Sequence, residues 1–234
     1  MLTHYTSQEQ LLAAGPLFLG YFMTAITEDH LRTFSKDEVN SLPLFRYEGP
    51  VTIVRTPGEF AAAFERIREE RLLGFDTESK PAFRKGVINA PALIQIACSD
   101  RVFLIQLNRV PFNGEMASLL ASSDHVKTGV AIGDDIRLLS KLCPFTADGL
   151  VDLRDVARAK GLSTRGLRTL AANFLHMRIS KNAQCSNWGN NELTQQQIIY
   201  AATDAWVSRL IYEQMSELGF FAEDTTFSIK PDTE

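Results

Sequence analysis

The amino-acid sequence predicts an α/β sandwich built around a mixed β-sheet. Several apolar runs of strand length occur in the first two thirds of the chain. Residues 59–70 place apolar side chains at helical spacing between the first of these runs and the next, and residues 153–218 are mainly helical in character. Strands that are interspersed with helices favour a sheet whose faces are covered by helices.

The predicted elements follow one another with turn signals between them. Ser35 offers a cap for a short helix, residues 51–55 predict a strand, and Pro57-Gly58 predicts a turn before the amphipathic helix at 59–70. Further strands are expected at 71–78, 92–98, 101–107 and 126–132, and further helices at 113–122, 134–142 and most of 153–218, with breaks at Gly161, Gly166 and Gly189.

The expected domain organisation has three parts. Residues 1–33 form a leader that is poorly ordered or loosely packed, residues 34–222 form the folded domain, and residues 223–234 form a polar tail. Met23 opens a second plausible start, so residues 1–22 could come from an upstream start codon. No stretch reaches the ~18–20 apolar residues that a membrane span needs, so no membrane association is expected.

Composition excludes several classes of protein. The chain has 234 residues, of which 45% are hydrophobic and 22% charged, which excludes disorder as the main state. The formal net charge of −4 excludes a uniformly basic nucleic-acid coat. Cys98, Cys143 and Cys185 are odd in number and include no CxxC pair, which argues against a disulfide framework or a cysteine zinc site. This pattern fits a reducing compartment and predicts a cytoplasmic protein.

Basic residues are nevertheless concentrated in one segment. Residues 154–185 contain seven Lys or Arg against the single acid Asp155, a local excess of +6. Such a cluster can face phosphates, although an ordinary solvated helical face explains the charge equally well.

The sharpest local feature is LLGFDTES, residues 72–79. Side chains alternate along a strand, so Asp76 and Glu78 share a face with Gly74, opposite Leu73 and Phe75. Two carboxylates at the end of an apolar strand repel each other, and a divalent cation would compensate. A strand that simply runs out into solvent is the alternative.

Two further acidic motifs are weaker when each is taken alone. In GVAIGDDIRLL, residues 129–139, a strand runs into Gly133 and two aspartates at the start of a helix. Asp134 is well placed as a helix cap or first-turn acid without a catalytic role, whereas Asp135 would lie inside the first turn and could project toward the strand ends. In residues 197–215, Tyr200 and Asp204 lie one helical turn apart and so share a face.

Together the motifs Asp-x-Glu, Asp and Tyr-x-x-x-Asp resemble the DEDD superfamily of 3′–5′ exonucleases, in the subgroup with tyrosine in the last motif. The sequence is similar there to the Werner-type and ribonuclease D-like exonuclease domains, over about residues 36–220. GVINAPALIQIACSDRVFLIQL looks like the second and third strands of the family, and the stretch from LRTLAANFL to YAATDAW resembles the approach to its last motif.

The resemblance implies a ribonuclease H-like fold with a five-stranded mixed sheet flanked by helices. It also implies two divalent cations, Mg²⁺ or Mn²⁺. The implied catalytic residues are Asp76, Glu78, Asp135, Tyr200 and Asp204, and the four acids among them are the implied metal ligands. Asp135 matches the family spacing, six residues after Gly129 and four before Leu139, while the adjacent Asp134 stays an alternative.

The function implied is metal-dependent removal of nucleoside 5′-monophosphates from the 3′ end of a single-stranded or 3′-recessed nucleic acid. DNA is preferred because the Werner-type likeness is stronger. Ribonuclease D-like processing of RNA 3′ ends and an inactive nucleic-acid-binding module are the alternatives. An unrelated nucleotide-binding α/β enzyme finds no support, because no GxGxxG, P-loop or GxSxG motif is present.

The expected nucleic-acid contacts lie in three places. They are Lys80, Arg84 and Lys85 after the first motif, Arg165, Arg168 and Lys181 in the basic segment, and Trp188, which could stack a base or instead pack the last helix onto the sheet. The sequence makes no prediction of oligomeric state.

Overall fold

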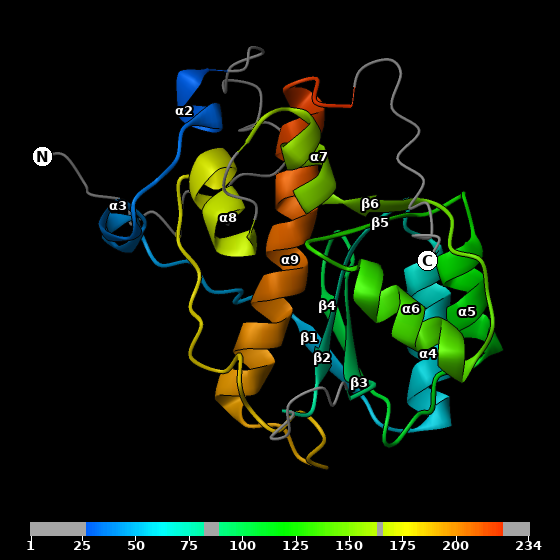
Figure 1. The fold of residues 1–234 in the computed structure, drawn as a ribbon. Helices are drawn as coiled ribbons and strands as arrows, with labels where there is room; N and C mark the ends of the chain where they lie inside the picture. The colour runs from blue at the N-terminus through cyan, green and yellow to red at the C-terminus, as the bar shows by residue number, and fades with distance from the viewer. Residues whose placement is uncertain (1–26, 82–88, 163–165, 222–234) are drawn as a thin grey trace, which may run out of the picture.

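A six-stranded mixed sheet forms the centre of the molecule (Figure 1). The structure, a computed structural model, describes residues 27–81, 89–162 and 166–221. The strands are β1 (Val51–Val54), β2 (Leu72–Ser79), β3 (Pro91–Ala97), β4 (Val102–Gln106), β5 (Val126–Gly129) and β6 (Leu150–Asp152), in the spatial order β1-β4-β3-β2-β5-β6. Only β3 runs antiparallel to its neighbours. The mixed sheet is confirmed, with a sixth strand, β6, that the sequence did not predict.

Helices cover both faces of this sheet (Figure 1). They are α2 (Glu28–Leu31), α3 (Lys36–Ser41), α4 (Pro57–Arg68), α5 (Gly114–Ala121), α6 (Gly133–Leu142), α7 (Leu153–Ala159), α8 (Leu167–Leu175) and α9 (Gln195–Glu217). Side chains of α4, α5 and α6 form one apolar core with the sheet, while α9 packs on the other face and is itself covered by α7 and α8. This confirms the predicted sandwich.

Local hydrogen bonding explains where several elements begin. Ser35 and Glu38 form the capping box of α3, as the sequence predicts. Thr56 and Glu59 form the same motif at α4, so Pro57 and Gly58 belong to the first turn of that helix and do not form a separate turn. This prediction was therefore wrong.

Two other boundaries also differ from the expectation. β5 ends at Gly129 and not at residue 132, because the chain turns sharply at Ala131, whose φ of 61° lies in the left-handed region. The described residues between 153 and 218 contain three helices, and the long connection between α8 and α9 is not helical.

The packed part of the chain begins before residue 34. Asn173 in α8 donates hydrogen bonds to the carbonyl oxygens of His30 (3.1 Å) and Arg32 (2.8 Å), which ties α2 to α8. These residues were expected in a loose leader, but their backbone carbonyls are used as acceptors by a buried side chain. Residues 1–26 and the expected polar tail at 223–234 lie outside the described residues. No described helix combines the length and apolar character required to cross a membrane.

The alternation of β2 separates its apolar residues from its acids. Leu73 and Phe75 point into the core shared with α4, α5 and α6. Gly74 faces α9 so closely that an added Cβ atom would lie 2.0 Å from the carbonyl oxygen of Ala205. Since Asp76 follows two residues later on the same face, this close approach brings its carboxylate beneath α9.

Candidate active site

The carboxyl-terminal end of β2 supplies the first two acids. Asp76 and Glu78 are partly exposed and line a cleft beside α9. The Asp76 carboxylate accepts a hydrogen bond from the backbone N–H of Thr77 (2.9 Å). Both acids therefore sit where the apolar part of the strand ends and the cleft begins.

The helix α9 supplies Asp204 and Tyr200, one turn apart, to the same cleft. Asp204 is 5% exposed, and its Oδ1 atom has no hydrogen-bond partner among the described residues. The Tyr200 hydroxyl hydrogen-bonds to the same carboxyl group. The Tyr200 ring also packs against Trp188, with a centroid separation of 5.9 Å.

The two candidate acids of the second motif both lie in the first turn of α6, but their environments differ. Asp134 is exposed and forms an ion pair with Arg137 (2.6 Å). Asp135 is partly buried, and its charge acts on both Asp76 and Glu78. It does not line the cleft itself. Of the two acids, only Asp135 faces the others.

Asp152 is a supporting residue that the sequence analysis missed. Its carboxylate accepts hydrogen bonds from the backbone N–H groups of Ala131 (2.9 Å) and Ile132 (3.1 Å), the turn that leads into α6. It also caps α7 through the N–H of Arg154. Asp152 thus holds the turn that orients Asp135. The sequence feature that could have indicated this role is an aspartate at the end of the short apolar run at 150–152.

Burial and neighbouring negative charges disfavour the ionised forms of the acids in the cleft. Burial raises the pKa of Asp76 well above its usual range, and the charge of Asp204 raises it further. Burial, with Asp76 as the next cause, raises the pKa of Glu78 to about 9. Burial also raises the pKa of Asp204 to about 7, although the hydrogen bond from Tyr200 opposes the rise. The cluster is therefore costly to ionise without a compensating positive charge.

A hard divalent cation fits this donor set. All the donors are carboxylate oxygens, and the unpartnered Oδ1 of Asp204 is an available ligand atom. Within the described ranges, no three His, Cys, Asp or Glu side chains already converge closely enough to hold one ion. The fit therefore rests on the chemistry of the donors and on their shared burial.

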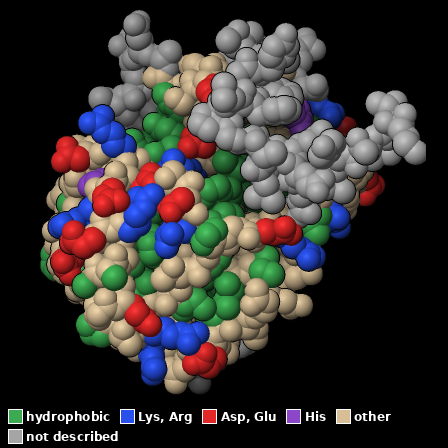
Figure 2. All heavy atoms as spheres, turned by 180° about the vertical axis from the view of Figure 1, so that it is seen from behind, with side chains coloured by type: hydrophobic (Ala, Val, Ile, Leu, Met, Phe, Trp, Pro, Cys, Tyr) green, Lys and Arg blue, Asp and Glu red, His purple; other side chains and the backbone are tan. Residues whose placement is uncertain are grey.

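The cleft measures about 730 Å³ and combines acidic and basic walls. Asp76, Glu78, Asp204 and Tyr200 are among its lining residues. The cations among its lining residues come from α3, α7, α8 and the connection before α9: Lys36, Arg154, Arg168 and Lys181. Figure 2 shows the face turned away from the view of Figure 1, where acidic and basic side chains alternate over short distances.

The protein residues that were expected to contact nucleic acid differ in whether they line the cleft. Arg168 and Lys181 line the cleft, whereas Lys80 is exposed and its aliphatic chain packs over Gly189. Trp188 is fully buried and packs in the core beneath α9, which confirms the packing alternative and removes base stacking by this side chain. Arg84, Lys85 and Arg165 lie outside the described residues.

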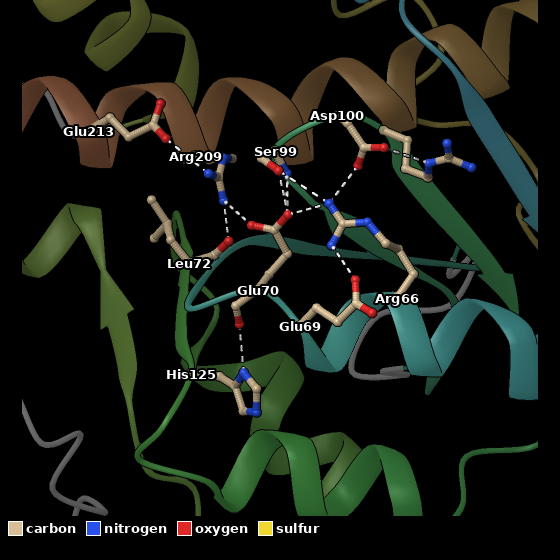
Figure 3. A network of polar contacts seen from close by, with 10 residues as sticks. Arg66, Glu69, Glu70, Leu72, Ser99, Asp100, His125, Arg209 and Glu213 are labelled. Carbon is tan, nitrogen blue, oxygen red and sulfur yellow. Dashed lines mark hydrogen bonds and ion pairs between the residues drawn. The ribbon is translucent and has the colours of Figure 1, made fainter. Parts of the chain in front are cut away.

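A polar network fixes α9 against the opposite end of β2 (Figure 3). Arg209 donates to the carbonyl oxygen of Leu72 and pairs with Glu70 (3.5 Å) and Glu213 (3.2 Å). Burial alone would raise the pKa of Glu70, but hydrogen bonds from Ser99 and Arg66 hold it below its ordinary value. The network positions α9, and with it Asp204, relative to β2.

The fold and the acid cluster define a nuclease of the ribonuclease H-like, DEDD type. The sequence matches the 3′–5′ exonuclease family over residues 51–219. The chain therefore belongs to the 3′–5′ exonuclease family, as its motifs predict.

Relatives and solved structures agree with this assignment. The mouse bifunctional 3′–5′ exonuclease/ATP-dependent helicase WRN is 29% identical over 195 residues, which cover 79% of this chain and 14% of the mouse protein. The Nibbler EXO domain of Aedes aegypti superposes with a TM-score of 0.67 at 22% identity, covering 76% of this chain and 94% of that domain. Trypanosoma brucei RNase D in complex with RNA U12 gives 0.64 at 19% identity, covering 73% and 63%. The chain thus spans a small part of its mouse relative.

Proposed function

We propose that this chain is a metal-dependent 3′–5′ exonuclease that hydrolyses phosphodiesters and releases nucleoside 5′-monophosphates. The observation that carries the proposal is the cluster of the partly exposed Asp76 and Glu78 with the buried Asp204 in a cleft that is also lined by cations. The charge of Asp135 acts on Asp76 and Glu78 and adds to the negative charge of this cluster. Such a site suits the cleavage of an anionic polymer only when divalent cations are present.

Two Mg²⁺ or Mn²⁺ ions would be held by Asp76, Glu78, Asp204 and Asp135, and would stabilise the charge that develops on the phosphate oxygens. Burial, followed by the charge of Asp204, raises the pKa of Tyr200 far above its ordinary value, so the phenol stays protonated. Its proton is donated to Asp204, which leaves the Tyr200 oxygen free to accept a hydrogen bond from the attacking water. Tyr200 therefore orients the water and does not act as a strong base.

The substrate proposed is a single-stranded or 3′-recessed nucleic-acid end. Lys36, Arg154, Arg168 and Lys181 would contact its phosphates as the 3′ end reaches the acids. DNA is the preferred polymer in this proposal, because the mouse relative combines exonuclease and helicase. RNA is the second candidate, because an RNase D of the same fold is known with bound RNA. The free cysteines fit a reducing, cytoplasmic location.

The test is a time course on 5′-labelled single-stranded DNA and RNA with Mn²⁺. We expect a ladder that shortens one nucleotide at a time from the 3′ end, and we expect EDTA and Asp76→Asn to abolish it. Asp134→Asn is the matched control, because that acid is exposed and paired outside the cluster. A folded protein that binds either strand without shortening it would overturn the proposal in favour of the binding module.

The basic wall is tested by the salt dependence of binding. Lys181→Ala should weaken binding of both polymers and reduce the slope of log affinity against log salt by about 1. Lys141→Ala, an exposed change on α6 outside the cleft, should leave the slope unchanged. If the two variants show equal slopes of log affinity against log salt, Lys181 does not contact the phosphates of the nucleic acid.

A further inference from the structure

A fully buried glutamine on β3 lies beside the acid cluster without a hydrogen-bond partner. Gln95 is 0% exposed, and neither its Oε1 nor its Nε2 atom is bonded to any described residue. Gln106 on the adjacent strand β4 is equally buried, but its Oε1 accepts from Arg55 (2.9 Å) and its Nε2 donates to the carbonyl of Asn190 (3.0 Å). Gln106 shows that a buried glutamine in this sheet can have both amide atoms hydrogen-bonded, whereas Gln95 has neither.

The register of the sheet places Gln95 next to Asp76. The two residues are direct partners in the antiparallel pairing of β2 with β3, so their side chains share the face that α9 covers. Directly opposed residues have Cβ atoms about 4.5–5.5 Å apart, within the reach of a glutamine amide.

Most of the other neighbours of Gln95 on this face are apolar. The polar exceptions are its diagonal neighbours, Glu78 on β2 and Gln106 on β4. The amide of Gln106 is already hydrogen-bonded to Arg55 and Asn190. The partner of Gln95 on β4 is Leu104, and Leu93 and Ala97 flank it on β3. Facing side chains of α9 in the same core include Ala201 and Ala205. An unsatisfied buried amide is costly, and the amide of Gln95 has Asp76 as its directly opposed polar neighbour.

We propose that Gln95 is a positioning residue whose amide donates a hydrogen bond to Asp76 and orients that carboxylate toward a bound divalent cation. The inference rests on the proposed function of the site. The strand pairing places Gln95 opposite Asp76. An amide N–H can hydrogen-bond the Asp76 carboxylate without adding charge to the acid cluster. Because Gln95 is fully buried, it acts through Asp76 and does not touch the substrate.

The test compares Gln95→Leu with the wild-type protein, first in metal-free form. Leucine keeps the side-chain volume and removes the proposed donor to Asp76, so the midpoint of urea unfolding should move to lower urea concentration. Mn²⁺ binding measured by calorimetry without substrate should weaken by about 10–100-fold, the usual effect of removing a residue that orients a ligand. The kcat should fall in the same range while KM for the oligonucleotide stays unchanged.

Gln106→Leu is the matched control, because it removes a buried glutamine that is fully bonded. It should lower stability and leave Mn²⁺ affinity unchanged. If Gln95→Leu is more stable but binds Mn²⁺ as the wild type does, Gln95 is only an unpaired amide and the inference fails. Gln95→Met provides a second apolar variant, and failure of both to fold would make Gln95 a core residue and also overturn the inference.

The activity controls separate this inference from the proposed function. If the wild type forms no ladder with either polymer, the proposed function fails, whereas the calorimetric comparison still tests the effect of Gln95 on Asp76. If the wild type forms a ladder that Asp76→Asn abolishes and Gln95→Leu preserves at the same Mn²⁺ dependence, only the role of Gln95 fails.

Discussion

Replacing Gly74 by alanine should separate α9 from β2 and so disassemble the acid cluster. The added Cβ atom would lie 2.0 Å from the carbonyl oxygen of Ala205 and 3.0 Å from the Cβ of Arg209. Real Cβ atoms do not approach other heavy atoms more closely than 3.0 Å, so the helix must retreat by about 1 Å. The obstacle is backbone, which cannot rotate away as a flexible side chain could.

Two magnitudes follow from this displacement. Overpacking a close-packed contact costs about 1–3 kcal/mol of unfolding free energy. Asp204 is adjacent to Ala205, so the same retreat moves its carboxylate relative to Asp76, and a misplacement of about 1 Å can lower activity about 100-fold. The loss of activity should therefore exceed the loss of folded protein, because a protein of ordinary stability stays folded after a loss of this size.

Urea unfolding and the exonuclease time course measure the two effects on the same sample. Gly58→Ala is the control, since that glycine lies in α4 with nothing within 4 Å of the added Cβ atom, and alanine should stabilise that helix by about 0.5–1 kcal/mol. A Gly74→Ala protein that keeps wild-type stability and activity would refute the reasoning about this contact.

Three other predictions concern the charges around the site. The pKa of Glu78 is about 9 in the folded protein against an ordinary 4.5, so metal-free stability should fall as the pH rises between these values. Mn²⁺ affinity should rise over the same interval, by about tenfold per pH unit for one released proton, and a flat calorimetric profile would contradict this. Asp135→Asn should lower kcat more than about tenfold and Asp134→Asn less than about twofold, with equal losses counting against Asp135. Arg209→Met should cost about 1–3 kcal/mol in urea unfolding, because Glu70 loses one partner but keeps Arg66 and Ser99, and adding Glu70→Gln should recover part of it.

The parts of the fold that depend on local pattern could be predicted from the sequence. The alternation of β2 places Asp76 and Glu78 on one face, and the helical period places Tyr200 and Asp204 on one face, without any knowledge of tertiary contacts. The structure then brings these two faces together in one cleft. The spacing that selected Asp135 over Asp134 depends on the resemblance, and the exposure of Asp134 agrees with it.

The parts that depend on long-range packing could not be predicted. β6 has three residues, too few to show an alternating pattern, and it forms only because β5 offers an edge. Trp188 lies in a polar, glycine-containing segment, so the sequence alone left base stacking and core packing both open, and only the packing against Tyr200 decides between them. The partnership of Gln95 with Asp76 requires the register of two strands that are separated by the segment around residues 82–88.

The two ends of β2 play opposite roles in holding α9. At the Asp76 end, buried carboxylates on strand and helix repel each other and favour separation. At the Leu72 end, four residues away, Arg209 and Glu70 tie the same helix to the same strand, and Gly74 between them permits contact with the backbone. The contacts of Arg209 with Leu72 and Glu70 therefore stabilise the packing of α9 on β2, which repulsion between the acids would oppose. A divalent cation held by those acids would offset their repulsion, so on this proposal added Mn²⁺ should stabilise the folded chain most at high pH, where the acids are ionised.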